Sequence, residues 1–595
     1  MVMSPRYFPA ACMPLLAAAL LGACTLAIAA PSQPQDPRDS NALIMTAEIA
    51  LRRDDCGQAS SDYTAAAQRL SNVELAKRAA EVSLGCGQYE TAARAAARWH
   101  QLLPADPEPL HASVQAALGQ YKIDAARSAF QTWLQSSKSA ASAAGRAAKS
   151  APKSGTPNKG MDALAENNVV HQVEQLASES GVPATLAMLR GVQAPPLQNG
   201  EGQLALADLA FNGWNYREAL QYAQHALDGG AERASAQVLL ARAHAGLGEA
   251  DAAVAAAAAA RAAAPKEQSF ADADVLILLG REDDARQALE VLGQNPALKT
   301  QAQRRLGLLA FSAGQYDVAS RSFTALLSDR ESSAVAVYYL AAIAERRDDL
   351  GTALRGYQLL AGTALETTAR VHAATMLYKH GHRPEAMKLL APANDATPAA
   401  RVEAEIAQSQ LLADGGEGDQ AVARLDDALA RSPGHPDLLY QKAIVLDKAG
   451  HTDAAVAQLE ELYRQRPDDC AIANALGFIL ADHGRDLSRA QRLIGAALKI
   501  EPDNPAILDS LGWLYFKRGN AKLAEPLLER AFRLDQDADI GAHWGEVLWS
   551  LGEKAKAREA WSRALVADPD NAAVKAAEDR LGQPQLLSPG TGTSI

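Results

Sequence analysis

The chain has 595 residues, a formal net charge of -12 and an aromatic content of only 5%. A chain of this length holds several domains or one long repeat array. Its acidity argues against binding of nucleic acid, whose phosphate backbone attracts basic surfaces. Much of its apolar content is alanine, the best helix former, so the composition favours an all-α protein with closely approaching helices.

Residues 1–30 are predicted to be a targeting segment, in which an apolar run follows Arg6. Residues 21–24 read Leu-Gly-Ala-Cys and resemble the lipobox of bacterial lipoproteins, which would make Cys24 the lipidated first residue. Two alternatives stay open. Cleavage after Ala29 would release a soluble periplasmic protein, and retention of the uncharged run would leave a membrane anchor.

The residue after the lipobox cysteine is Thr25 rather than aspartate. By the sorting rule of such lipoproteins, this favours the outer membrane, with the mature chain facing the periplasm. A triacylated cysteine carries enough acyl chain for stable anchoring.

Residues 31–135 are predicted to hold N-terminal helical repeats of weak similarity. A low-complexity basic linker or loop is predicted at 136–161, because residues 136–160 contain five basic residues and no acidic one. We expect a solvated spacer there, and contact with anionic lipid or an acidic partner is the alternative. Residues 162–582 are predicted to form the main repeat array, and 583–595 a disordered tail.

Small residues recur with fixed steps through the array. In LDSLGWLYFKRGNAKLAEPLLERAF, which starts at Leu508, they fall at Gly512, Ala524 and Ala531, with steps of 12 and 7. The same steps connect Gly545, Ala557 and Ala564, then Ala374, Ala386 and Ala393, and also Ala241, Ala253 and Ala260.

This pattern resembles the tetratricopeptide repeat and implies an α-solenoid, a right-handed superhelix of antiparallel helix pairs. Small residues allow the paired helices to approach, and a glycine such as Gly519 ends the first helix in a left-handed conformation. About thirteen or fourteen units are predicted. From Gly477 the later columns shift by one residue, which indicates an insertion near Asp486, in the turn.

The repeat positions bring two cysteines together. Cys56 starts the second helix of the first unit, and Cys86 lies near the end of the first helix of the next unit. Because these helices are antiparallel neighbours, a Cys56–Cys86 disulfide is sterically sensible in an oxidising compartment. Two separate buried thiols are the alternative.

Motifs that carry chemistry are missing from the sequence. There is no HExxH, GxSxG, GxxxxGK[ST] or paired CxxC. We therefore predict no enzyme activity, no cofactor and no metal site. His380 and His382 are expected to be solvated at a turn, and His543 is expected to be a surface residue of a repeat helix.

The first helices of such repeats line the concave face of the superhelix. An inward row of aromatic residues in an aromatic-poor protein is typical of a groove for peptides or proteins. The alternative is that several of these side chains only pack between neighbouring helices. The predicted partner-binding residues are Tyr338, Tyr378, Tyr440, Phe478, Trp513, Phe516, Lys517 and Trp549.

The lipobox, followed by an array that ends in LGFILADHGRDLSRAQRLIGAALKIEPDNPAILDSLGWLYFKRG and HWGEVLWSLGEKAKAREAW, looks like a group of proteobacterial outer-membrane repeat lipoproteins. That resemblance implies an adaptor that binds a periplasmic carboxy-terminal processing protease and presents peptidoglycan hydrolases to it. The alternative is a periplasmic assembly factor for polysaccharide or envelope export, and a third hypothesis is an enzyme with an unrecognised site.

Overall fold

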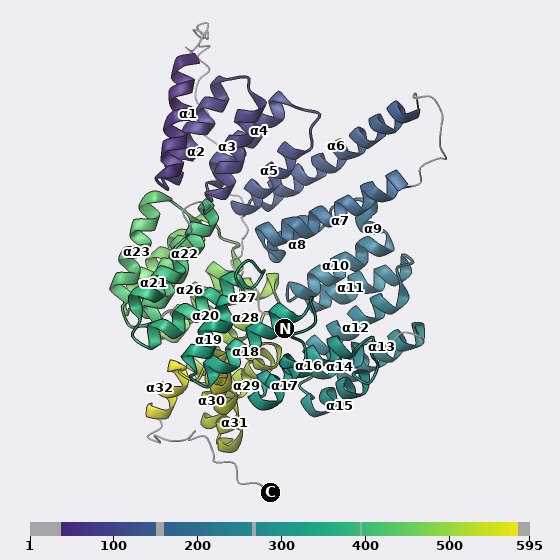
Figure 1. Cartoon of the computed structure of the whole chain (residues 1–595), viewed down its shortest axis with the longest axis vertical. Helices are drawn as coiled ribbons and strands as arrows, with labels where there is room; N and C mark the ends of the chain where they lie inside the picture. The colour runs from purple at the N-terminus through teal and green to yellow at the C-terminus, as the bar shows by residue number, and fades with distance from the viewer. Residues whose placement is uncertain (1–36, 150–159, 265–268, 393–395, 581–595) are drawn as a thin grey trace. The chain divides into compact units, whose positions relative to one another are not determined.

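The computed structural model describes residues 37–149, 160–264, 269–392 and 396–580. Across these ranges the chain forms helices and no strand, so the predicted all-α fold is confirmed. Consecutive helices form pairs, and within each of the chain's two compact units neighbouring pairs stack in sequence order (Figure 1). The predicted targeting segment 1–30 with Cys24, and the predicted tail 583–595, lie outside the described residues.

The described residues divide into two compact units, each made of two stretches of chain. Unit 1 comprises residues 197–390 and 474–580. Its helices are α10 (Gly200–Asn212), α11 (Tyr216–Asp228), α12 (Arg233–Leu247), α13 (Ala250–Ala263), α14 (Ala271–Leu278), α15 (Glu282–Leu292), α16 (Lys299–Ser312), α17 (Tyr316–Thr324), α18 (Ser333–Arg346), α19 (Leu350–Gln358), α20 (Glu366–Lys379), α21 (Arg383–Leu390), α27 (Leu487–Ile500), α28 (Pro505–Lys517), α29 (Ala521–Leu534), α30 (Ala538–Ser550), α31 (Lys554–Ala567) and α32 (Ala572–Arg580).

Unit 2 comprises residues 37–196 and 391–473. Helices α9 (Pro195–Gln198) and α26 (Cys470–Asp482) run from unit 2 into unit 1. The other helices of unit 2 are α1 (Pro37–Arg52), α2 (Cys56–Arg69), α3 (Val73–Gly85), α4 (Tyr89–Leu102), α5 (Glu108–Gly119), α6 (Ile123–Lys149), α7 (Gly160–Ser180), α8 (Val182–Leu189), α22 (Pro398–Asp414), α23 (Gly418–Arg431), α24 (Pro436–Lys448) and α25 (Thr452–Gln465).

The small residues of the repeat lie where the two helices of a pair cross. A Cβ atom on Gly545 would lie 2.2 Å from the indole nitrogen of Trp561, and one on Gly512 would lie 2.7 Å from Cγ of Leu528. Both distances are well below van der Waals contact, so the close approach of these helices requires glycine.

The turns between paired helices are short and use left-handed backbone. Gly519 has φ +79°, and α29 begins two residues later. The corresponding glycine of the preceding pair is Gly484, with φ +65°, and α27 begins three residues later, after Asp486 with φ +32°. The extra residue lies where the shifted columns predicted it.

The predicted linker at 136–161 differs from the structure in its first part. Helix α6 continues to Lys149, and α7 starts at Gly160. Residues 136–144 contain no glycine or proline, and their alanine, serine and lysine residues are compatible with helix. The loop assignment was therefore wrong for 136–149, and residues 150–159 lie outside the described ranges.

Within unit 1, the C-terminal ends of second helices, and the loops after them, dock onto the ends of distant first helices and the turns that follow those. The backbone N–H of Asp503 donates to the carbonyl of Trp214 (3.0 Å), and its carboxylate accepts from the N–H of Tyr216 (2.8 Å). The guanidinium of Arg533 donates to the carbonyl of Ala245 (3.1 Å) at the end of α12. Further contacts of this kind join Arg563 to Glu282, Tyr316 to Val566 and Arg346 to Ala567.

Unit 2 repeats the same edge-to-edge arrangement. The Arg401 guanidinium lies 2.8 Å from the Asp54 carboxylate, and the Gln88 amide donates to the carbonyl of Pro433 (3.0 Å), 345 residues away. The Arg466 guanidinium lies 5.2 Å from the ring centroid of Tyr121 and donates to the carbonyl of Gly119. These contacts explain why each compact unit combines two distant stretches, whereas the sequence suggested a single division at 136–161.

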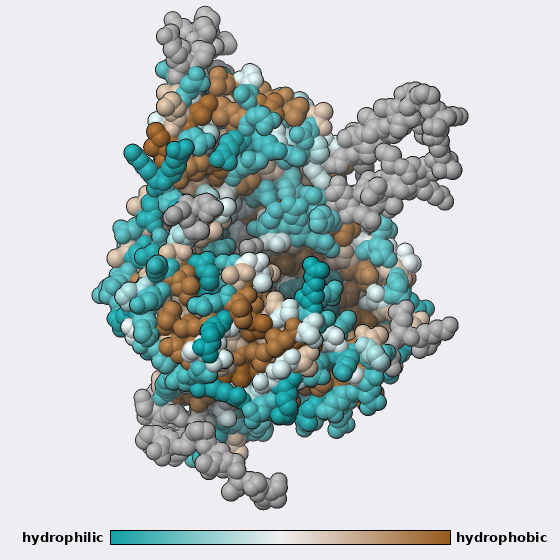
Figure 2. Space-filling view, in the orientation of Figure 1, coloured by the Kyte–Doolittle hydropathy of each residue, from teal (hydrophilic) through white to brown (hydrophobic). Residues whose placement is uncertain are grey.

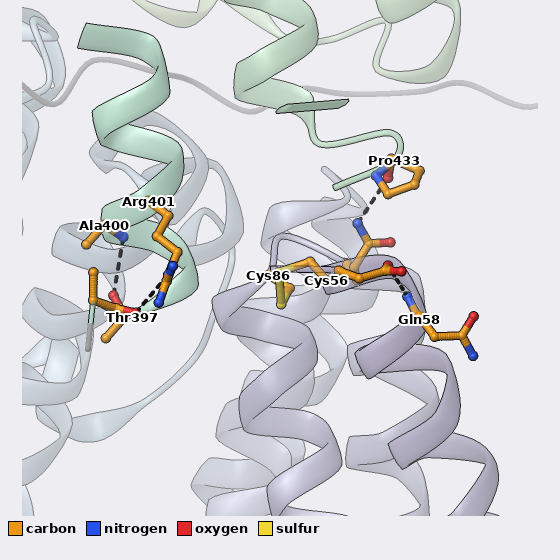
Figure 3. The surroundings of a disulfide bond; sticks show 10 residues. Cys56, Gln58, Cys86, Thr397, Ala400, Arg401 and Pro433 are labelled. Carbon is orange, nitrogen blue, oxygen red and sulfur yellow. Dashed lines mark hydrogen bonds between the residues drawn. A yellow bond between two sulfur atoms is a disulfide. The ribbon is translucent and has the colours of Figure 1, made fainter. Parts of the chain in front are cut away.

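The structure joins Cys56 and Cys86 by a disulfide, with a Cα–Cα distance of 5.5 Å (Figure 3). Cys56 is the first residue of α2, and Cys86 directly follows α3. The disulfide therefore ties the start of one helix to the end of the next, beside the loop at Pro433. Cys470 is buried where α26 begins.

Candidate functional site

Aromatic and charged side chains from three successive first helices converge in unit 1. The first helices of neighbouring pairs lie in contact, for example α28 with α30, and together they form a surface that we call the first-helix face. The convergent residues, here called the Trp513 cluster, are Phe478 and Asp482 on α26, Asp509, Trp513, Phe516 and Lys517 on α28, and His543 on α30.

Trp513 is the centre of this cluster and is only 5% exposed. Its indole N–H donates to the Asp482 carboxylate (2.9 Å). The His543 ring stacks on it with a centroid distance of 4.1 Å, and the ring of Phe516 lies 5.2 Å away. The Lys517 ammonium lies 4.9 Å from its ring centroid. Trp513 was predicted to present its ring to a partner, but neighbouring repeats cover it.

Asp482 and Lys517 form the polar edge of the cluster. The ammonium donates to the backbone carbonyl of Asp482 (2.8 Å) and lies 3.1 Å from a carboxylate oxygen of the same residue. Burial raises the pKa of Asp482, but the Trp513 hydrogen bond and the nearby Lys517 charge outweigh burial and hold that pKa below its usual range. The carboxylate is therefore ionised at neutral pH.

His543 is paired and largely buried, which corrects its assignment as a surface residue. Its side chain is 12% exposed, and Nδ1 lies 2.9 Å from a carboxylate oxygen of Asp509. Burial lowers the pKa of this histidine, but the negative charge of Asp509 and its hydrogen bond outweigh burial and raise it above the usual value. The pair links α28 to α30 across a repeat boundary.

A second cluster in unit 1 uses the same repeat positions. The Tyr338 hydroxyl lies 3.0 Å from Nε2 of His372, 34 residues later, which is the separation between Asp509 and His543. The other ring nitrogen of His372 lies 3.0 Å from the carboxylate of Glu345. Tyr338 is therefore engaged between repeats rather than freely presented. Figure 2 shows apolar side chains gathered on the face of the molecule where Figure 1 draws α18 to α20.

Three further predicted residues have other surroundings. Tyr378 is 8% exposed, with the Arg383 guanidinium 5.0 Å from its ring centroid, so it presents little surface. Tyr440 lies in unit 2, where burial raises its pKa. Trp549 is half-buried at the end of α30, and its ring centroid lies 5.6 Å from that of Trp561.

The structure thus brings together four of the eight predicted partner-binding residues, namely Phe478, Trp513, Phe516 and Lys517. Phe516 is half-buried and Lys517 is exposed, so these two offer surface to a partner. Sequence reasoning missed Asp482, Asp509 and His543 as members of the cluster. Each of them lies about one repeat length along the sequence from its partner on the neighbouring first helix, and this spacing is the signal that could have found them.

Neither a cluster of potential metal ligands nor a helix able to span a membrane is found among the described residues. No group of three or more histidine, cysteine, aspartate or glutamate residues there is arranged to hold a metal ion. His380, expected to be solvated, lies 2.9 Å from the Asp348 carboxylate. None of the helices described is long and apolar enough to span a membrane.

Comparison with known families agrees with the repeat assignment. Tetratricopeptide repeat models match residues 304–365, 412–477 and 479–539. Among curated proteins, the TPR repeat-containing protein PA4667 of Pseudomonas aeruginosa is 28% identical over 209 residues, which cover 35% of each chain. The cellulose synthase operon protein C of Pseudomonas fluorescens is 30% identical over 156 residues, which cover 25% of this chain and 12% of that protein. The chain therefore matches only about a third and an eighth of the lengths of these relatives.

Solved structures with similar repeats include TTC0263, a thermophilic TPR protein of Thermus thermophilus. It is 21% identical with a TM-score of 0.27, and the alignment covers 30% of this chain and 98% of that one. The APC/C hetero-tetramer Cut9–Hcn1 is 15% identical with a TM-score of 0.29, over 87% of this chain and 97% of that chain.

Proposed function

We propose that this chain, a solenoid of tetratricopeptide repeats, is a non-enzymatic scaffold that binds other proteins at the bacterial cell envelope. The Trp513 cluster is the observation that carries the proposal. Three successive first helices place aromatic rings, carboxylates and a cation within one small area, and aromatic and charged side chains dominate protein-binding hot spots. The exposed edge of this area, at Phe516 and Lys517, is where a partner makes contact.

The partner in this proposal is a periplasmic carboxy-terminal processing protease, and the protein substrates that the scaffold presents to it are peptidoglycan hydrolases. The resemblance of the lipobox and of the C-terminal repeats to outer-membrane repeat lipoproteins supports this choice. Holding protease and substrate on one chain raises their effective concentration without any chemistry by the scaffold.

Attachment through a lipidated Cys24 would place the scaffold on the outer membrane, facing the periplasm. A Cys24→Ser variant should leave the membrane fraction and appear in the soluble periplasm. Full retention of the unprocessed variant in membranes would contradict the lipid anchor. Release of wild-type chain with its N-terminus at residue 30 would favour the soluble periplasmic alternative.

A second candidate is an assembly factor for polysaccharide or envelope export. The relative named cellulose synthase operon protein C supports this alternative, since it is 30% identical to this chain over 156 residues. Affinity capture from envelope extracts separates the two. Recovery of a serine protease supports the first proposal, and recovery of synthase or porin components supports the second.

The capture should be compared with a Phe516→Ala/Trp549→Ala variant. Both side chains are only half-buried, so the variant should keep its helical circular dichroism spectrum. It should recover less of the partner protein than wild type does. Leu523→Ala is the matched control, because Leu523 is 57% exposed on the second helix α29. Equal recovery of the partner by wild type, the double variant and the Leu523→Ala control would exclude the first-helix face as the binding surface.

A further inference from the structure

We infer that the Trp513 cluster is a receptor for one basic side chain of a bound protein, and that Lys517 occupies this receptor in the unbound chain. The inference rests on the proposed function and deepens it, because it specifies the partner's chemistry. The recognised group is an arginine or lysine in an exposed segment of the partner. Two independent features support it, namely the position of the Lys517 ammonium and the distribution of charge between the two helix layers.

The ammonium of Lys517 has the contacts of a bound cation. It lies 4.9 Å from the ring centroid of Trp513, 3.1 Å from the Asp482 carboxylate, and donates to the Asp482 carbonyl (2.8 Å). The ammonium therefore combines a cation–π contact to the indole with an ion pair to the carboxylate. The two groups come from different repeats, so the site is formed by stacking of α26 on α28.

Charge is segregated between the two helix layers in this region. The first helices α26, α28 and α30 carry four acidic residues against one lysine, Lys517, and one histidine, His543, which is paired with Asp509. The second helices α27, α29 and α31 carry ten basic residues and three acidic ones. Such a face attracts a basic segment and repels an acidic one, whereas the second-helix layer does the opposite. The acidic residues of the three first helices are Asp482, Asp509, Asp539 and Glu546.

The rest of the cluster holds the receptor in place. The His543 ring stacks on Trp513 and pairs with Asp509, so the indole is fixed by a neighbouring repeat. Asp482 is held by the indole N–H as well as by the lysine. Displacing Lys517 therefore uncovers an indole and a carboxylate that are already oriented.

Lys517 is suited to be displaced. Its side chain is 30% exposed, and a lysine has a flexible four-carbon stem with a strongly hydrated charge. Arginine is the better competitor, because its planar guanidinium stacks on an indole while it donates to a carboxylate. A partner arginine would replace the internal ammonium, and Lys517 would turn to solvent.

The test is a binding series with the full chain and a defined probe. The probe is a fluorescein-labelled peptide, Ala-Gly-Ser-Arg-Ser-Gly-Ala, with twins in which alanine or glutamate replaces the arginine. Binding is followed by fluorescence anisotropy for wild type, K517M, K517R and the control K556M. Lys556 lies on the second helix α31 with a 66% exposed side chain.

K517M should bind the arginine peptide at least about tenfold more tightly than wild type, which corresponds to about 1.4 kcal/mol. The alanine and glutamate twins should show no gain, and K556M should behave as wild type. K517R keeps an internal cation over Trp513 and should show no gain either. A D482N/K517M double variant should lose the gain.

An unchanged affinity of K517M for the arginine peptide would overturn the inference, and so would an equal gain for the alanine twin. K517R keeps a cation at this position, so an unchanged affinity of K517R beside the gain of K517M attributes that gain to removal of the internal charge. A higher affinity of K517R alone for the arginine peptide would also contradict the inference, because K517R still places a cation in the receptor. Affinity capture tests the proposed function separately. If wild type recovers no envelope protein while K517M gains affinity, the scaffold role fails and the receptor stands.

Discussion

Breaking the Cys56–Cys86 disulfide should loosen a defined part of unit 2. The bond closes a loop of 30 residues that contains α2, the following turn and α3. In the chain-entropy model, a disulfide that closes a loop of this length lowers the entropy of the unfolded chain by about 12 cal/mol/K. Breaking it therefore costs about 3.6 kcal/mol of stability at 25 °C. Since each 1.4 kcal/mol is a factor of ten, amides that exchange by opening of this region should exchange about 400-fold faster.

Hydrogen exchange with and without a reductant measures this effect directly. Wild type should show the acceleration in α2 and α3 when reductant is added, while a Cys56→Ala/Cys86→Ala variant should exchange fast under both conditions. A Cys470→Ala variant should keep the sensitivity of wild type, because Cys470 lies outside the closed loop. Identical exchange of α2 and α3 in oxidised and reduced wild type would show that the disulfide does not stabilise these helices.

Three further predictions concern packing and pH, each measured by urea unfolding. Gly545→Ala, whose Cβ would lie 2.2 Å from the Trp561 indole nitrogen, should cost more stability than Gly381→Ala, which meets no atom within 4 Å but has φ +82°. We expect at least about 3 kcal/mol against about 1 kcal/mol, and equal losses would contradict helix crossing at Gly545. Because the pKa of His543 is raised in the folded chain, its pairing stabilises below the unfolded pKa and is lost as pH rises through the folded one. The stability difference between wild type and His543→Gln should therefore shrink from pH 6 to pH 9, and a pH-independent difference would exclude an ion pair. Burial raises the pKa of Asp469 to about 7, so its ionisation opposes folding increasingly as pH rises from the unfolded pKa to that value, and Asp469→Asn should stabilise the chain more at pH 8 than at pH 5. A benefit that does not grow with pH would show that Asp469 is solvated.

The repeat architecture was predictable because it depends on local spacing. Gly512 and Gly545 are required by contacts within a single helix pair, and those contacts leave a regular trace along the sequence. The additional residue at Asp486 was predictable for the same reason, since one inserted residue shifts every later column. The continuation of α6 to Lys149 was missed because a polar, low-complexity composition indicates that a segment is exposed to solvent. It does not indicate whether the exposed backbone is helical.

The candidate site was only partly predictable, because it depends on which partner a side chain finds in the next repeat. The columns placed Trp513, Phe516 and Lys517 on one first helix, but they gave no sign that His543 stacks on the indole and covers it. The docking of Asp503 on the turn at Tyr216 was also beyond the sequence, because it joins segments 287 residues apart. Such contacts depend on the accumulated rotation of many repeats, which local spacing does not specify.

Site-specific photo-crosslinking tests the central claim, that the first-helix face of unit 1 holds other proteins. A photoreactive phenylalanine analogue would replace Phe516 on α28 in one chain and Leu523 on the second helix α29 in another. Illumination in envelope preparations should join the position 516 chain to a discrete protein partner and leave the position 523 chain uncoupled. Crosslinks of equal yield to the same proteins from both positions, or none from position 516, would exclude the first-helix face as the binding surface.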